Sequence, residues 1–83
     1  MNLVTVQCMG AFREIGESFT VDAEEMIVQS VRKAVENHLT ASSQFELVEV
    51  LNRSTFACDD KLLRDHDALE SQIVILLPPV AGG

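Results

Sequence analysis

The stretch IVILLPP, residues 73–79, joins five apolar strand-forming side chains to two prolines. A short apolar run without alternation is typical of a strand that is covered on both faces, at the centre of a sheet. Proline has no backbone N–H for the ladder, so Pro78 and Pro79 end this strand abruptly. The stretch therefore predicts a central last strand, with residues 80–83 left beyond it.

The segments before this strand predict further strands. Residues 3–9 and 17–21 alternate between apolar and polar side chains, which favours two half-buried strands joined by a turn at 10–16. Residues 45–51 are rich in β-forming side chains and predict a third long strand. A short strand is expected around residues 55–57.

An amphipathic helix is predicted over residues 23–39. Asp22 is placed to act as its N-cap, and Glu25, three residues later, completes a capping box. One face of this helix is apolar at helical spacing and is expected to pack on the sheet. Its residues are Ile27, Val28, Val31, Ala34, Val35 and Leu39.

The order of these elements predicts the fold. Residues 58–71 are highly charged, so a surface loop is expected there, with one helical turn at 61–63. A hairpin, a crossing helix and a closing central strand form an α+β roll, with the last strand between the first and the third and parallel to the first. We therefore predict a ubiquitin-like β-grasp domain over residues 1–79, with a mixed sheet of about four to five strands and one main helix packed on one face.

Composition narrows the possible functions. The chain has 83 residues and a net charge of −7, from 13 acidic and 6 basic side chains. A domain of this size holds one modest core and no enclosed cleft of the usual enzyme size. The negative charge disfavours nucleic acid and suits a basic protein partner, or simply keeps the chain soluble. Without a signal peptide or an apolar run of membrane length, we expect a cytoplasmic protein with no membrane contact.

The metal-ligating and nucleophilic side chains form no catalytic pattern. Cys8 and Cys58 are too far apart for a zinc signature, and His38 and His66 each stand alone. Cys8 lies in an apolar run and is expected to be buried, whereas two aspartates after Cys58 should raise its thiol pKa. The triplet DHD at 65–67 is interpreted as solvated surface. We therefore expect no metal, no bound cofactor and no enzyme activity for the chain on its own.

The last four residues suggest a chemistry of their own. Residues 80–83 carry neither charge nor a large side chain, so they are expected to form a flexible C-terminal tail. The carboxylate of a terminal glycine can be activated as an acyl-adenylate. Attack by sulfur on this acyl-adenylate gives a thiocarboxylate, and attack by a lysine gives an amide. Gly82 suits a narrow channel because it has no Cβ, and the two prolines stiffen the base of the tail. The alternative is a frayed end that finishes in glycine by chance.

The sequence LLPPVAGG at 76–83 closely resembles the C-terminus of the molybdopterin synthase small subunit and of related, thiamine-type ubiquitin-like sulfur carriers. That group ends in Pro-Pro-Val-(small)-Gly-Gly. More thinly, AFRE at 11–14 resembles the segment after the first strand, and VLNR at 50–53 resembles the turn before the short strand. The family usually has an Asp-Gly-Asp turn before its last strand, whereas this chain has LESQ at 69–72, which implies a different turn.

The resemblance implies a sulfur-carrier protein. An adenylyltransferase resembling the ubiquitin-activating enzyme would use ATP to adenylate Gly83, where the thiocarboxylate would then form, and Gly82 would give channel clearance. The sulfur would go to the large subunit of molybdopterin synthase, for molybdenum cofactor biosynthesis. Other acceptors would be enzymes that make thiamine, cysteine or another thio-metabolite. A ubiquitin-like protein modifier and a non-catalytic interaction module are the alternatives.

The resemblance also implies an apolar docking surface on the sheet. Its best matches are Met9, Phe56 and Leu77, of which Met9 and Leu77 fall on the less buried side of their strands. Ordinary core packing is the alternative for all three. The tail residues expected to contact the partner are Pro78, Pro79, Val80 and Ala81.

Overall fold

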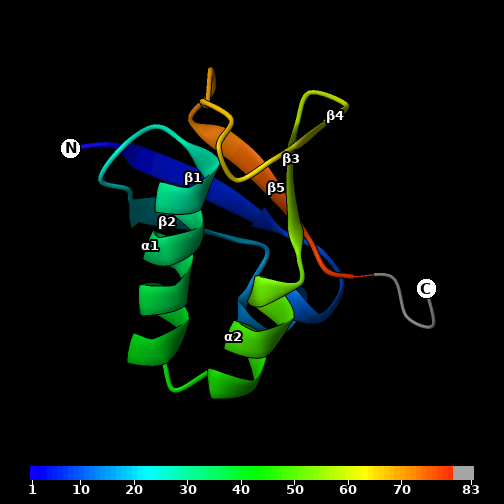
Figure 1. The fold of residues 1–83 in the computed structure, drawn as a ribbon. Helices are drawn as coiled ribbons and strands as arrows, with labels where there is room; N and C mark the ends of the chain where they lie inside the picture. Colours follow the sequence, from blue (N-terminus) through cyan, green and yellow to red (C-terminus); the bar gives the residue numbers. More distant parts are fainter. Residues whose placement is uncertain (80–83) are drawn as a thin grey trace.

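The computed structural model describes residues 1–79 and contains a five-stranded mixed sheet with two helices on one of its faces (Figure 1). The elements are β1 (Leu3–Cys8), a 3₁₀ helix η1 (Gly10–Ile15), β2 (Ser18–Asp22), α1 (Val28–Ala41), α2 (Phe45–Asn52), β3 (Thr55–Cys58), β4 (Lys61–Leu63) and β5 (Ile73–Leu77). The strand order across the sheet is β2-β1-β5-β3-β4. Neither helix in this part of the chain has the length and apolar character needed to cross a lipid bilayer.

The predicted central position of β5, parallel to the first strand, is confirmed. It lies at the centre of the sheet and pairs in parallel with β1, where Cys8 stands opposite Leu76. On its other side it pairs antiparallel with β3, where Phe56 stands opposite Leu76. The neighbour is thus the short strand predicted around 55–57, and not the segment 45–51. The result is the β-grasp arrangement expected from the order of elements.

One apolar layer between the sheet and the helices forms the core. Alternate residues of β1 and β5 point into it, as the pleat of a strand requires. The helix α1 contributes the apolar face that the sequence predicts. The buried residues of these three elements are Val4, Val6, Cys8, Val28, Val31, Val35, Leu39, Val74 and Leu76. The predicted buried thiol of Cys8 is therefore confirmed.

The predicted start of the helix is wrong. Asp22 is the last residue of β2, and its carboxylate accepts a hydrogen bond from the backbone N–H of Asn2 at 2.9 Å instead of capping a helix. The helix α1 begins at Val28, after an N-cap residue without a side-chain cap bond. The N–H groups of Val28 and Gln29 donate to the carbonyls of Asp67 and Asp65, at 3.0 and 2.9 Å. A segment far away in the sequence therefore caps this helix, which local sequence cannot indicate.

The segment predicted as a strand over 45–51 is the helix α2. Its β-branched residues Val48 and Val50 suggested a strand, but the buried residues Leu47 and Leu51 are spaced four apart, as one face of a helix requires. Figure 1 shows α2 beside α1 on the same face of the sheet. The Arg32 guanidinium of α1 donates to the carbonyl of Leu51 in the last turn of α2, where a positive charge is favourable.

Two shorter predictions also need correction. The helical turn expected at 61–63 is the edge strand β4, which forms a hairpin with β3. The two residues between these strands, Asp59 and Asp60, have φ of 48° and 65°. Aspartate tolerates this left-handed conformation, which a tight hairpin turn requires. The turn expected at 10–16 contains the 3₁₀ helix η1, which buries Phe12 completely.

Candidate functional site

The base of the C-terminal tail is fixed at the centre of the sheet. β5 is paired on both sides up to its end, since Leu76 stands opposite Cys8 and Leu77 stands opposite Thr55. Pro78, which is half-buried, cannot continue either ladder because it has no N–H. Pro79 is exposed. The remaining residues assigned to the tail site, Val80, Ala81, Gly82 and Gly83, lie outside the described residues.

The side of the sheet that faces away from the helices, called here the outer face, is apolar along β5 and polar at Thr5 and Gln7 of β1. Ile73, Ile75 and Leu77 run along β5 with side chains opposite to those of the buried Val74 and Leu76. The apolar residues of the outer face are Leu3, Met9, Ala57, Leu62, Ile73, Ile75 and Leu77. The register places Ile75 level with Gln7 and Ala57, and Ala57 level with Leu62, so these side chains share one side.

The outer face corrects one sequence interpretation. The uninterrupted run at 73–77 suggested that both faces of β5 are covered, yet Ile73 is 51% exposed, and Ile75 and Leu77 are only half-buried. In residues 1–79, the helices cover the inner side alone. Contiguous exposed apolar side chains on a small domain are typical of an interaction surface. The apolar run therefore contains one core side and one side that is open to a partner.

The three residues predicted for docking separate into two groups. Met9 is 41% exposed and its backbone is extended, so it continues the side of β1 that lies level with Leu77 on the outer face. Phe56 is only 1% exposed and lies in the core, with the Arg32 guanidinium 5.2 Å from the centre of its ring. For Phe56 the alternative of core packing therefore holds. Its position across from Leu76, which is also buried, explains this inward orientation.

Sequence reasoning missed most of the outer face. The predicted docking surface does not include Leu3, Ile73, Ile75 or Leu62. Of these, Leu3 and Ile73 are about half exposed, and Leu62 is more exposed. The available signal was parity with Met9 and Leu77, because alternate residues on one strand share a face. Leu62 carries no such signal, because its three-residue strand stands in a highly charged segment that predicts a loop.

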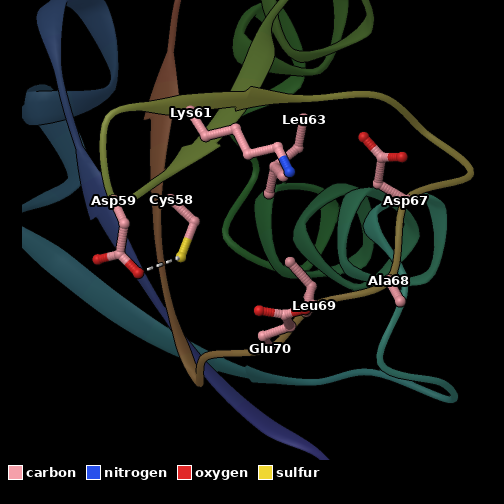
Figure 2. A pocket seen from close by; sticks show the side chains of 8 residues that line it. All are labelled: Cys58, Asp59, Lys61, Leu63, Asp67, Ala68, Leu69 and Glu70. Atoms are coloured by element: carbon pink, nitrogen blue, oxygen red, sulfur yellow. Dashed lines mark hydrogen bonds between the residues drawn. The ribbon is translucent and has the colours of Figure 1, made fainter.

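A pocket of about 380 Å³ lies at the opposite end of β5, between the β3–β4 hairpin and the segment before β5 (Figure 2). Its lining consists of Cys58, Asp59, Lys61, Leu63, Asp67, Ala68, Leu69 and Glu70. The Cys58 thiol donates a weak hydrogen bond to the Asp59 carboxylate, with Sγ and Oδ2 3.7 Å apart. Burial raises the pKa of Cys58, and the negative charge of Asp59 raises this pKa further. The predicted direction is confirmed, and such a thiol is a poor nucleophile at neutral pH.

The triplet at 65–67 has structural roles. Asp65 accepts two hydrogen bonds from the Arg32 guanidinium, the shorter at 2.8 Å. Asp67 accepts one from the backbone N–H of Arg64 at 2.7 Å, which closes a local turn. His66 is exposed and its Nε2 lies 3.9 Å from a carboxylate oxygen of Asp67. Within residues 1–79, no cluster of three histidine, cysteine or acidic side chains is arranged to hold a metal ion.

Comparison with known proteins identifies the fold. No protein-family model matches the sequence, and a search of curated proteins finds no significant match. Among solved structures, SAMP1 from Haloferax volcanii is similar to this chain, with a TM-score of 0.69 and 16% sequence identity. The similarity covers 98% of this chain and 99% of SAMP1. Together with the strand order, it shows that the chain has the ubiquitin-like β-grasp fold.

Proposed function

We propose that this chain is a sulfur carrier whose C-terminal glycine, Gly83, is adenylated and then converted to a thiocarboxylate. Within that class we propose the role of molybdopterin synthase small subunit, in molybdenum cofactor biosynthesis. One observation carries the proposal: a ubiquitin-like β-grasp domain whose central strand β5 leads, through Pro78 and Pro79, to Gly82-Gly83.

From this chain the chemistry needs only the terminal carboxylate, while ATP, hydrosulfide and a partner enzyme are supplied from outside. A carboxylate oxygen of Gly83 attacks the α-phosphorus of ATP and releases pyrophosphate. Hydrosulfide then attacks the carbonyl carbon of the acyl-adenylate, and AMP leaves with the former carboxylate oxygen. The partner enzyme supplies the nucleotide site, which is consistent with the role of the chain as a co-substrate. ATP would therefore be used by the partner, with no cofactor on this chain.

The position of the outer face supports a partner that receives the tail. Leu77 ends β5 immediately before Pro78, and its side chain belongs to the outer face. A protein that covers the outer face would therefore contact the end of β5, from which Pro78 and Pro79 lead to the tail. The net charge of −7 favours a partner with a basic rim around an apolar centre. Expected partners are a ubiquitin-activating-like adenylyltransferase and the large subunit of molybdopterin synthase or another sulfur-accepting enzyme.

Intact mass spectrometry tests the proposal. The chain ending at Gly83 is incubated with ATP, hydrosulfide and an adenylyltransferase from a sulfur-carrier system. We expect its mass to rise by the difference between one sulfur and one oxygen atom. A chain without Gly82 and Gly83 is the matched control and should remain unchanged.

The products also distinguish the alternatives. An unchanged mass with adenylyltransferases from the molybdopterin and thiamine pathways would contradict the proposal. Covalent conjugates to lysines, lost on deletion of Gly83, would instead indicate a protein modifier. If the thiocarboxylate forms but the large subunit of molybdopterin synthase does not consume it, the chain is a sulfur carrier and the role in molybdopterin synthesis is excluded.

A further inference from the structure

We infer that Gly10 is a positioning residue for the tail: its lack of a side chain lets the ring of Pro78 rest against the end of β1, which fixes where the reactive segment starts. The inference rests on the proposed function and adds a residue that acts through Pro78.

The contact between Gly10 and Pro78 leaves no room for a methyl group. A Cβ added to Gly10 would lie 2.7 Å from Cγ and 3.5 Å from Cδ of the Pro78 ring. Carbon atoms in contact are normally about 3.5–4.0 Å apart. The proline ring cannot rotate away as a flexible side chain can, because it is closed onto the backbone. Any side chain at Gly10 must therefore displace Pro78 or the end of β1.

Gly10 is itself held firmly. It has φ of +54°, a conformation that glycine adopts without strain and that starts the 3₁₀ helix η1. On one side of it, the N–H of Cys8 donates to the carbonyl of Glu17 at 2.9 Å. On the other, Phe12 is fully buried and its N–H donates to the carbonyl of Met9 at 3.1 Å. The Pro78 ring thus rests on a surface that is anchored in the core.

Such a support matters for a tail that must enter another protein. The parallel ladder fixes Leu76, and the contact with Gly10 extends that constraint to Pro78, which already has a fixed φ. Residues that are ordered before binding lose less entropy when they bind. A displaced Pro78 would start the tail from a different point and direction. The partner would then use part of its binding free energy to restore the position of Pro78, so its KM for this chain should rise.

The structure offers a matched control in Gly16. Gly16 has φ of +128°, where a side chain is also strained, but a Cβ there meets nothing closer than the Ser18 carbonyl at 3.8 Å. Gly16→Ala therefore strains the backbone without touching Pro78. Gly10→Ala combines strain with the clash. Gly10→Asn places the same Cβ against Pro78 with less strain, because asparagine tolerates the left-handed region.

The experiment measures kcat and KM for ATP-dependent activation of each folded variant by the adenylyltransferase. We expect Gly10→Asn to lower kcat/KM about five- to tenfold, chiefly through KM, because one or two residues must be reordered. Gly16→Ala should stay within about twofold of the wild type. In a Pro78→Ala background, which removes the obstructing ring atoms, Gly10→Asn should cause less than about a twofold further loss.

The outcomes separate the two proposals. If the wild type is activated and Gly10→Asn is as active as Gly16→Ala, the positioning role is wrong while the proposed function stands. An equal loss from Gly10→Asn in the wild-type and Pro78→Ala backgrounds would also overturn it, since this would indicate direct contact between residue 10 and the enzyme. A wild type that no adenylyltransferase modifies would overturn the proposed function and this inference with it.

Discussion

Replacement of Arg32 by alanine should destabilise the domain by about 3 kcal/mol, because this side chain connects four parts of the structure. Arg32 lies on α1, donates to the carbonyl of Leu51 at the end of α2, and pairs with Asp65 in the segment that caps α1. It also lies over the ring of Phe56 on β3. Its loss therefore removes contacts between both helices, the sheet and the segment before β5.

The interactions of Arg32 contribute unequally. The Asp65 side chain is 56% exposed, so the ion pair should contribute at most about 1 kcal/mol. The hydrogen bond to Leu51 is partly buried, and loss of this charged donor should cost about 1–2 kcal/mol. The contact with Phe56 should add about 0.5–1 kcal/mol. Most of the destabilisation by Arg32→Ala should thus remain in a protein that already carries Asp65→Ala. In that background Arg32→Ala should still cost about 2 kcal/mol.

The assay is equilibrium unfolding in urea, followed by far-UV circular dichroism because the chain has neither tryptophan nor tyrosine. Lys33→Ala is the matched control on the same helix. Among residues 1–79, Lys33 pairs only with Glu36 at 3.0 Å, and it is exposed, so its loss should cost less than about 0.5 kcal/mol. A cost for Arg32→Ala below about 1 kcal/mol, or equal to that of Lys33→Ala, would refute this reasoning.

The outer face and the β3–β4 hairpin lead to three further predictions. Ile73→Glu should lower kcat/KM for activation by the adenylyltransferase at least about tenfold, whereas Phe45→Glu, at an exposed position on α2, should not. Equal losses of kcat/KM in the two variants would exclude docking on the outer face. At pH 7, iodoacetamide should alkylate Cys58 more slowly than free cysteine, because the raised pKa of Cys58 leaves less thiolate. Asp59→Asn should restore part of the rate, and peptide mapping measures the alkylation rate of each protein. A rate at or above that of free cysteine would contradict the raised pKa. Asp60→Gly should stabilise the domain by about 0.5–1 kcal/mol in urea unfolding, because Asp60 has positive φ; a destabilisation would indicate that its side chain supports the turn.

The sequence predicted the parts of the fold in which one local signal dominates. β5 was recognisable because its apolar run ends at two prolines, and the helix face from Val28 to Leu39 because helical spacing is unambiguous over about three turns. The raised pKa of Cys58 was predicted from Asp59 beside it, although burial, the larger cause, gave no signal in the sequence. The tail chemistry, by contrast, rests on residues 80–83 and the family resemblance, and it stays a proposal.

The errors in the two helices have one physical cause in common, which is that distant contacts outweigh local preference. α1 begins five residues later than predicted because carbonyls of Asp65 and Asp67 cap it, which makes the capping signal at Asp22 irrelevant. α2 contains β-branched valines, yet burial of Leu47 and Leu51 against the core favours a helix. The outer face was hidden because both sides of β5 are apolar, so periodicity cannot show which side a partner could cover.

The parallel pairing of β1 and β5 has a mechanical consequence. Because these neighbouring strands run in the same direction, Leu3 and Leu77 lie at opposite ends of the pair. Tension applied between the two ends of the chain would therefore load the β1–β5 hydrogen bonds in shear, so that they must break together and not one at a time. An enzyme that unfolds this domain by pulling on its tail would meet its strongest resistance at the start of unfolding, when the β1–β5 hydrogen bonds must break.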